Sequence, residues 1–290
     1  MDILQRQGFY GPPAGESTIL GVEFSGTVVS VGSDVFSEWQ IGERVFGLVY
    51  GGAYSEYVVI EAAMAARLPN KISYAIGAAL PEVWLTAFQA LFWNCSLVTG
   101  EDVLIHAGAS AVGIAAIQLA KNAGARRIIV TVSSQEKIEF CTSLGATHAI
   151  NYKSDDFKTK VAEFTEDRGV DVIVDFIGAN YWDSNLASLA FDGRMVMLGF
   201  LGGPVVNSSN LGPILRKRLT VRGSALRSRS LAYQIKLKQQ VEQEVFKPIF
   251  EGKTDMRAII DREFSWKEIS EAHRYLESDK SKGKIVITVD

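Results

Sequence analysis

Hydrophobic and polar positions follow two different patterns along the chain. Up to about residue 65, apolar residues alternate with polar ones over short stretches, residues 20–31, 41–47 and 51–60, which glycine-containing turns separate. Alternation with a period of two predicts half-buried β-strands. Short strands at this spacing predict a small barrel or a partly open sheet. Residues 6–15 are rich in Gly and Pro and are expected to form a loop.

The period changes from residue 74 onward. Apolar residues first recur at helical spacing over 75–80 and 83–92, on either side of Pro81. Six β-prone runs then follow, with helical patterns such as 136–144 and 157–166 between most of them: residues 103–106, 128–132, 148–150, 171–175, 194–199 and 219–223. This alternation predicts a doubly wound parallel sheet in an α/β fold. The C-terminal part predicts a charged helix over 232–250, a helix around 266–273, and a strand over 284–289 that returns to the β-rich part.

Composition narrows the class of protein. Of the 290 residues, 47% are hydrophobic and 22% are charged, as in ordinary soluble globular proteins. A net charge of −3 gives no general attraction to nucleic acid or to anionic membranes, and no apolar run approaches the roughly 20 residues of a membrane span. The two cysteines, Cys95 and Cys141, lie in apolar helical contexts, which indicates free buried thiols in a reducing compartment. We therefore expect a cytoplasmic enzyme.

The most informative stretch joins the first strand of the α/β part to its helix. Residues 103–117 read VLIHAGASAVGIAAI, a strand, a turn of small residues and a helix. Gly108 and Gly113 hold the outer places of the dinucleotide fingerprint Gly-x-Gly-x-x-Gly, and Ser110 takes the middle one. N–H groups at a helix start lack partners and the helix dipole favours negative charge there, so this turn predicts a diphosphate site. Ala109 and Val112 complete the turn and are predicted to contact the same group.

The second strand of this part bears on the choice of cofactor. In an NAD site, an acidic side chain about 20 residues after the turn binds the ribose hydroxyls. Here the strand ends in Ser133 and Ser134, with Lys137 following, and two hydroxyls and an ammonium suit a 2′-phosphate. Glu136 stands three residues after Ser133, the spacing of a capping box, which would turn its carboxylate back onto the helix start. The pattern favours NADPH over NADH.

Other positions have plainer interpretations. Asp175 ends the fourth strand of the α/β part and is expected to cap a turn rather than to act in catalysis. The glycine-rich loop 199–203 follows the next strand at the carboxyl edge of the sheet, where it either lines the cofactor or is a flexible loop. His106 ends a strand that should be buried and is expected to be a hydrogen-bonded core histidine.

Several classes of site are disfavoured. The three histidines (His106, His148 and His273) and the two cysteines show none of the spacings of a zinc site, so no metal ligands are predicted. A serine hydrolase elbow would need a glycine where Val112 stands. Basic residues near the last strand of the α/β part are expected on a solvated sheet edge beside an anionic cofactor, rather than in a nucleic-acid site; they are Arg216, Lys217, Arg218, Arg222, Arg227 and Arg229.

The chain resembles the zinc-free quinone oxidoreductases of the medium-chain dehydrogenase/reductase superfamily, and among them the p53-inducible branch. The similar stretches span nearly all of it and are LQRQGFYGPPAG, ILGVEFSGTV, IGERVFGL, LPEVWLTAFQ, VLIHAGASAVGIAAIQLAK, LGATHAINYK and SALRSRS. The resemblance implies a GroES-like catalytic domain over residues 1–84 and 225–290, wrapped around a Rossmann NADPH-binding domain over residues 85–224. It also implies a homodimer joined through the last Rossmann strand, residues 219–223. Val22 stands where the zinc dehydrogenases of the superfamily have a histidine, which agrees with a site without metal.

Matching positions carry expected roles over from the family. Tyr10 and Ser110 match a tyrosine and a serine that contact cofactor or substrate, and they are the candidate catalytic residues. Lys137 and Tyr152 match contacts to the adenosine phosphate. The residues expected near the nicotinamide are Ile177, Leu198, Gly199, Phe200, Ser224 and Leu226. Relatives carry about 40 further residues ahead of Met1, a length that a few strands of ordinary size would fill, so the catalytic domain is expected to be N-terminally shortened.

The reaction that these residues imply is NADPH-dependent reduction of a quinone, in which the cofactor carries the hydride and Tyr10 can hydrogen-bond the substrate oxygen. Two alternatives stay open at this point. One is an NADPH-dependent enone or alkenal double-bond reductase on the same scaffold. The other is an NADPH-binding protein without turnover, which a shortened N-terminus would explain.

Overall fold

Contacts between residues divide the chain into two compact units. The computed structural model describes residues 1–35 and 38–289. One unit comprises Met1–Leu85 together with Leu226–Asp290, and the other comprises Thr86–Ala225.

The second unit is built on a six-stranded sheet in which every neighbouring pair is parallel. Its strands are β4 (Asp102–Ile105), β5 (Arg127–Val132), β6 (His148–Asn151), β7 (Val170–Asp175), β8 (Leu189–Met197) and β9 (Thr220–Gly223). The order β6-β5-β4-β7-β8-β9 is that of the doubly wound Rossmann fold, so the predicted fold class is confirmed. The central strands read as continuous apolar runs because helices cover both faces of such a sheet.

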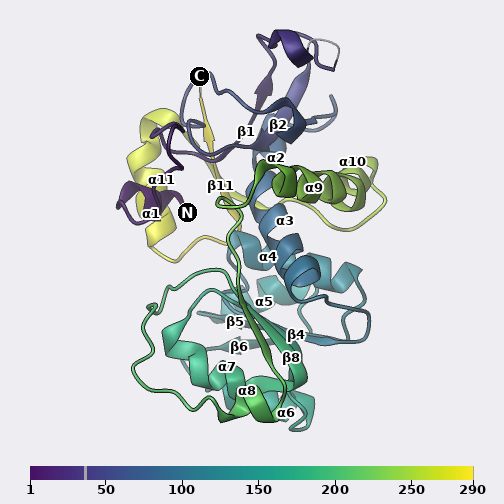
Figure 1. Cartoon of the computed structure of the whole chain (residues 1–290), viewed down its shortest axis with the longest axis vertical. Helices are drawn as coiled ribbons and strands as arrows, with labels where there is room; N and C mark the ends of the chain where they lie inside the picture. The colour runs from purple at the N-terminus through teal and green to yellow at the C-terminus, as the bar shows by residue number, and fades with distance from the viewer. Residues whose placement is uncertain (36–37, 290) are drawn as a thin grey trace. The chain divides into compact units, whose positions relative to one another are not determined.

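Helices of the second unit pack in two groups. α4 (Ala111–Asn122) contacts α5 (Gln135–Leu144), whereas α6 (Phe157–Thr165) contacts α7 (Trp182–Ser188), which contacts α8 (Gly212–Arg216) (Figure 1). A 3-10 turn, Ala179–Tyr181, precedes α7. Chain order in the sheet reverses at β4, with β5 on one side and β7 on the other. Ligands of such folds bind outside the carboxyl ends of the strands at this point, which is where residues 106–113 lie.

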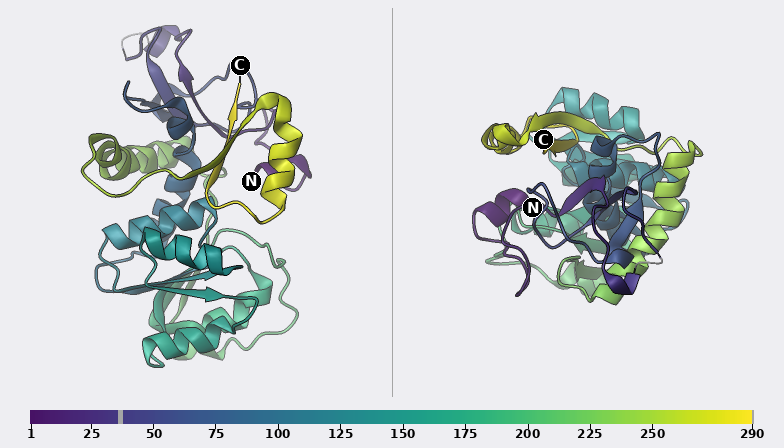
Figure 2. Two further views of the ribbon diagram at one scale, coloured as in Figure 1. Left: turned by 180° about the vertical axis from the view of Figure 1, so that it is seen from behind. Right: turned by 90° about the horizontal axis from the view of Figure 1, so that it is seen from above.

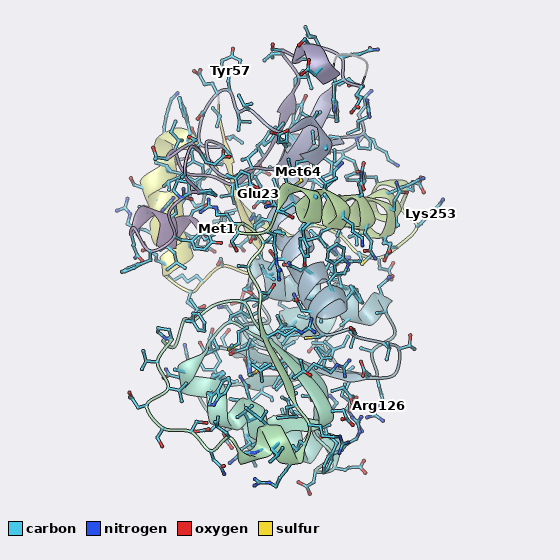
Figure 3. The ribbon with its side chains drawn as sticks, viewed as in Figure 1. Met1, Glu23, Tyr57, Met64, Arg126 and Lys253 are labelled. Carbon is cyan, nitrogen blue, oxygen red and sulfur yellow. The ribbon has the colours of Figure 1, made fainter. Side chains whose placement is uncertain are left out.

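The opposite, amino end of the sheet carries a cluster of charges. Asp102, whose side chain is fully buried, accepts hydrogen bonds from the guanidinium groups of Arg126, Arg127 and Arg168 at 2.5–3.3 Å. Arg168 also pairs with Asp171 at 2.5 Å. Arg126 reaches this carboxylate from the periphery of the unit, where about half of its side chain is exposed (Figure 3). The cluster ties the starts of β4, β5 and β7 together.

In the first unit, a three-stranded antiparallel sheet has the order β1-β2-β3. Its strands are β1 (Glu23–Thr27), β2 (Arg44–Leu48) and β3 (Ala65–Arg67), and two 3-10 turns, Ser33–Val35 and Ala62–Met64, lie between them in the chain. Phe46 of β2 contacts the rings of Phe246 and Phe250 at centroid distances of 5.3 and 5.7 Å. The C-terminal helices therefore complete the core of the N-terminal sheet.

Residues 51–60 do not form the predicted strand. Gly52 has a φ of +92°, and the Ser55 hydroxyl donates to its carbonyl oxygen, so the chain turns here. The N–H groups of Ala53 and Tyr54 still donate to Gly21 and Leu20, but without a continuous ladder. The predicted strand over 20–31 is likewise limited to Glu23–Thr27.

The C-terminal strand pairs with a strand that the pattern did not reveal. β11 (Lys284–Thr288) is parallel to β10 (Ile260–Ser265) in a separate two-stranded sheet. Trp266–Glu268 and α11 (Ile269–Glu277) connect the two strands. A short helix, α1 (Asp2–Arg6), lies beside α11 (Figures 1 and 2), where Arg6 contacts His273 and Glu277.

Two predicted helices contain π-helical segments. One run consists of α2 (Tyr74–Ala78), α3 (Pro81–Phe88) and the π-helix Gln89–Asn94. The other consists of α9 (Leu231–Val241), the π-helix Glu242–Phe246 and α10 (Lys247–Glu251). By length and composition the run Tyr74–Asn94 could cross a membrane, but 67% of its most apolar window is buried inside the protein, as in a core helix.

Candidate cofactor site

The turn between β4 and α4 is too tight for side chains at its two glycines. A Cβ on Gly108 would stand 2.7 Å from Cβ of Val130 in β5, and one on Gly113 would stand 2.5 Å from the carbonyl oxygen of Ala107. Real Cβ atoms essentially never come so close, and the backbone at Gly113 cannot move aside cheaply. These two glycines let the chain reverse directly into α4, as the fingerprint predicts.

Ser110 is the N-cap of α4. Its backbone is extended, and its Oγ accepts the N–H of Gly113 at 3.1 Å. One of the four N–H groups that a helix start leaves unpaired is thus satisfied by the cap, and those of Ala111 and Val112 are directed out of the helix end. The side chain of Ser110 is exposed. A closely approached turn with outward N–H groups and the positive end of a helix dipole fits a diphosphate.

The tip of β5 lies next to this turn and carries the residues predicted to bind the 2′-phosphate. The N–H of Gly108 donates to Thr131, and the N–H of Tyr152 donates to Val132, so the turn and the end of β6 both flank the tip. Ser133 and Ser134 follow directly, and Tyr152 is 40% exposed. The sheet therefore brings Ser133, Ser134 and Tyr152 to one edge beside the glycine turn.

The predicted capping box at Ser133 is wrong. The N-cap of α5 is Ser134, whose Oγ accepts the N–H of Lys137, so the third helical position holds a lysine and not Glu136. Ser134 has the extended backbone that an N-cap needs, which moves the helix start by one residue. Glu136 is exposed in the first turn, whereas only 7% of Lys137 is exposed. Burial raises the pKa of Cys141 to about 12, and the nearby positive charge of Lys137 partly opposes this rise.

Two loops at the ends of β7 and β8 are joined by backbone hydrogen bonds. Asp175 is buried, and its carboxylate accepts the N–H groups of Ile177 (2.8 Å) and Gly178 (3.0 Å), so the predicted capping role is confirmed. Burial raises the pKa of Asp175, and these N–H groups oppose the rise. Gly178 has a φ of +80° and packs against Phe200.

The second of these loops follows β8. The N–H groups of Leu198, Leu201 and Gly202 donate to Asp175, Phe176 and Ile177 respectively. Gly199 and Phe200 lie between these bonds, and Phe200 is half exposed. Ile177, Gly199 and Phe200, all predicted near the nicotinamide, are thus in one pair of loops at the carboxyl edge of the sheet.

A buried histidine connects the glycine turn with the rest of this edge. His106 is fully buried, with Nδ1 3.0 Å from the Thr131 hydroxyl and Nε2 2.7 Å from Oδ1 of Asn185 in α7. An Oδ1 acceptor requires the N–H on Nε2, so Nδ1 accepts from the hydroxyl. Burial lowers the pKa of His106 to about 4. The predicted core histidine is confirmed, and it is neutral at pH 7.

Ser224 directly follows β9 and takes part in a buried polar network. Its hydroxyl donates to Oε1 of Gln89 and accepts from Nδ2 of Asn94, both at 3.1 Å. Gln89 and Asn94 are the first and last residues of a π-helix, and both are buried. Sequence reasoning pointed to Ser224 but missed these two amides.

In the first unit, the candidate residues are Tyr10 and Leu226. Tyr10 is half-buried in the loop that follows α1, and burial raises its pKa while the charge of Arg227 opposes the rise. The Arg227 guanidinium lies over the Tyr10 ring, 4.8 Å from its centroid. The Leu226 carbonyl accepts the N–H of Arg229 and Nε2 of Gln234.

The basic residues are arranged only in part as predicted: Arg222 is exposed in β9, the edge strand of the sheet, but the others differ. Residues 216–218 precede β9 at the amino end of the sheet, opposite the turn; Arg218 pairs with Asp192, and Lys217 donates to the carbonyls of Ala187 and Leu189 at the end of α7. Lys217 and Arg218 are thus paired with groups at the end of the sheet opposite the glycine turn. Arg227, in the first unit, is no sheet-edge residue either.

The position that holds a zinc-ligating histidine in other dehydrogenases is apolar and buried here, as Val22. The adjacent Glu23, which is labelled in Figure 3, lies in the first unit. It forms an ion pair with Lys284 of β11 and accepts the N–H of Glu82. Among residues 1–35 and 38–289, no group of three or more His, Cys, Asp or Glu side chains is placed to hold a metal ion. Cys95 and Cys141 are free and buried, as predicted.

Comparison with known proteins places these features in a family. The family model described as an alcohol dehydrogenase GroES-like domain matches residues 1–70, and that of a zinc-binding dehydrogenase matches residues 111–241. "Quinone oxidoreductase-like protein 2" of Bos taurus is 30% identical over 299 residues, which cover 99% of this chain and 81% of the bovine one. The chain belongs to the quinone oxidoreductase family of the medium-chain dehydrogenase/reductase superfamily.

Solved structures agree with this family. The Escherichia coli quinone oxidoreductase complexed with NADPH superposes with a TM-score of 0.87 at 32% identity, over 99% of this chain and 86% of that one. The CurK enoyl reductase gives a TM-score of 0.85 at 30% identity, over 100% and 87% of the two chains. As a member of this superfamily, the chain is an NAD(P)-dependent oxidoreductase.

Proposed function

We propose that the chain is an NADPH-dependent quinone oxidoreductase that works without a metal. The observation that carries the proposal is the glycine turn beside the tip of β5, where Ser133 and Ser134 stand in place of the acid of an NAD site. We choose a quinone as the substrate because the bovine and E. coli relatives are named as quinone oxidoreductases.

Each candidate residue has a role in this proposal. Gly108, Ala109, Ser110, Val112 and Gly113 seat the diphosphate through backbone N–H groups at the start of α4. Ser133, Ser134, Lys137 and Tyr152 hold the 2′-phosphoadenosine end. Ile177, Leu198, Gly199, Phe200, Ser224 and Leu226 surround the nicotinamide, which supplies a hydride when bound. Tyr10 donates a hydrogen bond to the substrate oxygen, and no strong acid is required because the reduced quinone takes its proton from water.

The choice of NADPH is tested at Lys137. The Lys137→Met variant is expected to raise the Kd of NADPH about ten- to a hundredfold, since a hydrogen bond between charged groups contributes about 1.5–3 kcal/mol. The Kd of NADH should stay within about twofold, because NADH lacks the 2′-phosphate. Fluorescence titration of both cofactors gives the two constants.

Glu136→Gln is the matched control one residue earlier in α5. It removes the exposed carboxylate of the first turn and should leave the preference between the two cofactors unchanged. Equal losses for NADPH and NADH in Lys137→Met, or a selective loss of NADH affinity in Glu136→Gln, would contradict the assignment of NADPH.

The activity itself is tested by mixing the purified, folded protein with NADPH and 1,2-naphthoquinone. We expect NADPH oxidation well above the background without protein. A second candidate, an enone or alkenal double-bond reductase, is favoured by the similarity to the CurK enoyl reductase. Faster NADPH oxidation with an alkenal than with the quinone would favour the double-bond reductase. No NADPH oxidation with either compound would indicate a protein that binds the cofactor without turnover.

We also propose a cytoplasmic homodimer. β9 is the last strand of the six-stranded sheet, and no further strand pairs with it among the residues that the structure describes. An open edge of this kind can pair with its counterpart in a second copy. Free, buried thiols fit a reducing compartment. Sedimentation velocity distinguishes a dimer from a monomer of 31.7 kDa.

A further inference from the structure

The guanidinium of Arg227 donates hydrogen bonds to three parts of the first unit: the loop that carries Tyr10, the segment at Tyr50, and helix α1. Its Nη1 donates to the carbonyl oxygens of Tyr10 (3.2 Å) and Gly11 (3.3 Å). Its Nη2 donates to the carbonyl oxygen of Tyr50 (2.5 Å) and to Oε1 of Gln5 (3.4 Å). One guanidinium thus joins two separate segments of backbone, residues 10–11 and residue 50, and one buried amide.

The loop that carries Tyr10 depends on this residue. It begins and ends at glycines with positive φ, Gly8 (+83°) and Gly15 (+91°). In the described part of the chain, the carbonyls of Tyr10 and Gly11 have no hydrogen-bond donor other than Arg227. The guanidinium also covers the ring of Tyr10. Backbone and side chain of Tyr10 are therefore held by the same group.

Gln5 is oriented by the same contact. Because Arg227 has only donors, the atom facing it must be Oε1, and Nε2 of Gln5 is turned the other way. Gln5 is 92% buried, being 8% exposed, and within the described residues its Nε2 has no hydrogen-bond partner. A buried donor without a partner is costly, and a ligand oxygen would satisfy it.

We propose that Arg227 is the positioning residue of the substrate half of the site, which holds Tyr10 and Gln5 as two hydrogen-bond donors for a quinone oxygen. The inference rests on the proposed function. The positive charge of Arg227 also favours the ionised form of Tyr10 and so opposes the rise in pKa that burial causes. A hydroxyl with a lower pKa is a stronger hydrogen-bond donor. Misplacement of a positioned group by about 1 Å can reduce a rate about a hundredfold, so loss of the guanidinium should be felt in turnover.

The test compares Arg227 with a matched arginine. Arg229 lies over the ring of Tyr233 at the same 4.8 Å, so Arg229→Gln removes an equivalent stack elsewhere. In Arg227→Gln we expect kcat/KM for 1,2-naphthoquinone to fall about ten- to a hundredfold, mainly through kcat, with the Kd of NADPH unchanged. Arg227→Lys keeps the charge but cannot span four acceptors, and should recover only part of the loss. Arg229→Gln should stay within about twofold of the original protein.

A second readout separates this proposal from the function on which it rests. Ultraviolet titration of tyrosine, taken as the difference from Tyr10→Phe, reports ionisation of Tyr10 without any turnover. In Arg227→Gln the pKa of Tyr10 should rise, and amides of residues 8–15 should exchange hydrogen faster. If neither changes, or if Arg227→Gln affects turnover no more than Arg229→Gln does, the positioning role is refuted. The other outcome is that no quinone supports NADPH oxidation by the original protein while the tyrosine titration shifts as expected. In that case the proposed function fails and the role of Arg227 in holding Tyr10 stands.

Discussion

Replacing Asp102 with asparagine is expected to lower the free energy of unfolding of the second unit by about 2–3 kcal/mol. The carboxylate is fully buried and accepts hydrogen bonds from three arginines. Asparagine keeps the shape but removes the charge that holds these cations at the starts of β4, β5 and β7. The loss stays moderate because Arg126 and Arg168 are about half exposed, so water replaces part of what they lose. Urea unfolding at pH 7 measures the difference.

Asp192→Asn provides the matched control. Asp192 pairs with Arg218, but both side chains are more than 60% exposed, and such pairs contribute at most about 1 kcal/mol. Asp192 has a φ of +60°, which asparagine also tolerates, so the control adds no backbone strain. Equal effects of the two substitutions would show that burial of Asp102 does not matter.

Acidification from pH 6.5 to pH 4 is expected to remove about 3 kcal/mol of stability through His106 alone, at 1.36 kcal/mol for each pKa unit. Burial lowers the pKa of this histidine from 6.5 to about 4. Over that interval the unfolded chain binds a proton that the native state does not, so unfolding becomes easier as the pH falls. Below about pH 4 both states are protonated at this position, and the contribution stops changing.

The measurement is the free energy of unfolding in urea at several pH values, for the original protein and for His106→Gln. Glutamine cannot take up the proton, so the variant should show a shallower decline even if it is less stable at pH 7. His148 and His273, whose pKa values burial also lowers, remain in both proteins and contribute to the residual slope, as do carboxyl groups whose pKa is lowered, such as Asp171. Parallel pH profiles would show that His106 is protonated in the folded state.

Strands of the second unit could be predicted from sequence because their runs are continuously apolar. Val103, Ile129 and Ile173 belong to strands covered on both faces, where the signal does not depend on register. The first unit gives weaker signals. β10 reads Ile-Asp-Arg-Glu-Phe-Ser, in which one apolar residue stands on each side of three charged ones. This pattern does not predict a strand. Residues 51–60 give the opposite error, because a positive φ at Gly52 interrupts a stretch that alternates well.

At the candidate site, the glycine turn, Asp175 and His106 were predictable because local spacing determines their surroundings. The helix start at Ser134 was off by one residue, since Ser133 and Ser134 are both good caps and only backbone geometry decides between them. The contacts of Arg227 were missed for a different reason. Its partners lie 177 to 222 residues earlier in the chain. Three of them are backbone carbonyls, which every residue type has, so the sequence cannot reveal them as acceptors.

The π-helix Gln89–Asn94 has a consequence for how relatives should be compared. In an α-helix each residue turns by about 100°, so positions five apart point in clearly different directions, whereas the wider π turn brings them nearly in line. That alignment lets Gln89 and Asn94 bind the same Ser224 hydroxyl. A π segment is equivalent to one inserted residue, so a relative with one residue fewer here would have an ordinary helix, in which the residues on the two sides of the gap are rotated relative to each other. A single-residue gap in an alignment at this point would therefore mark a different environment at the end of β9.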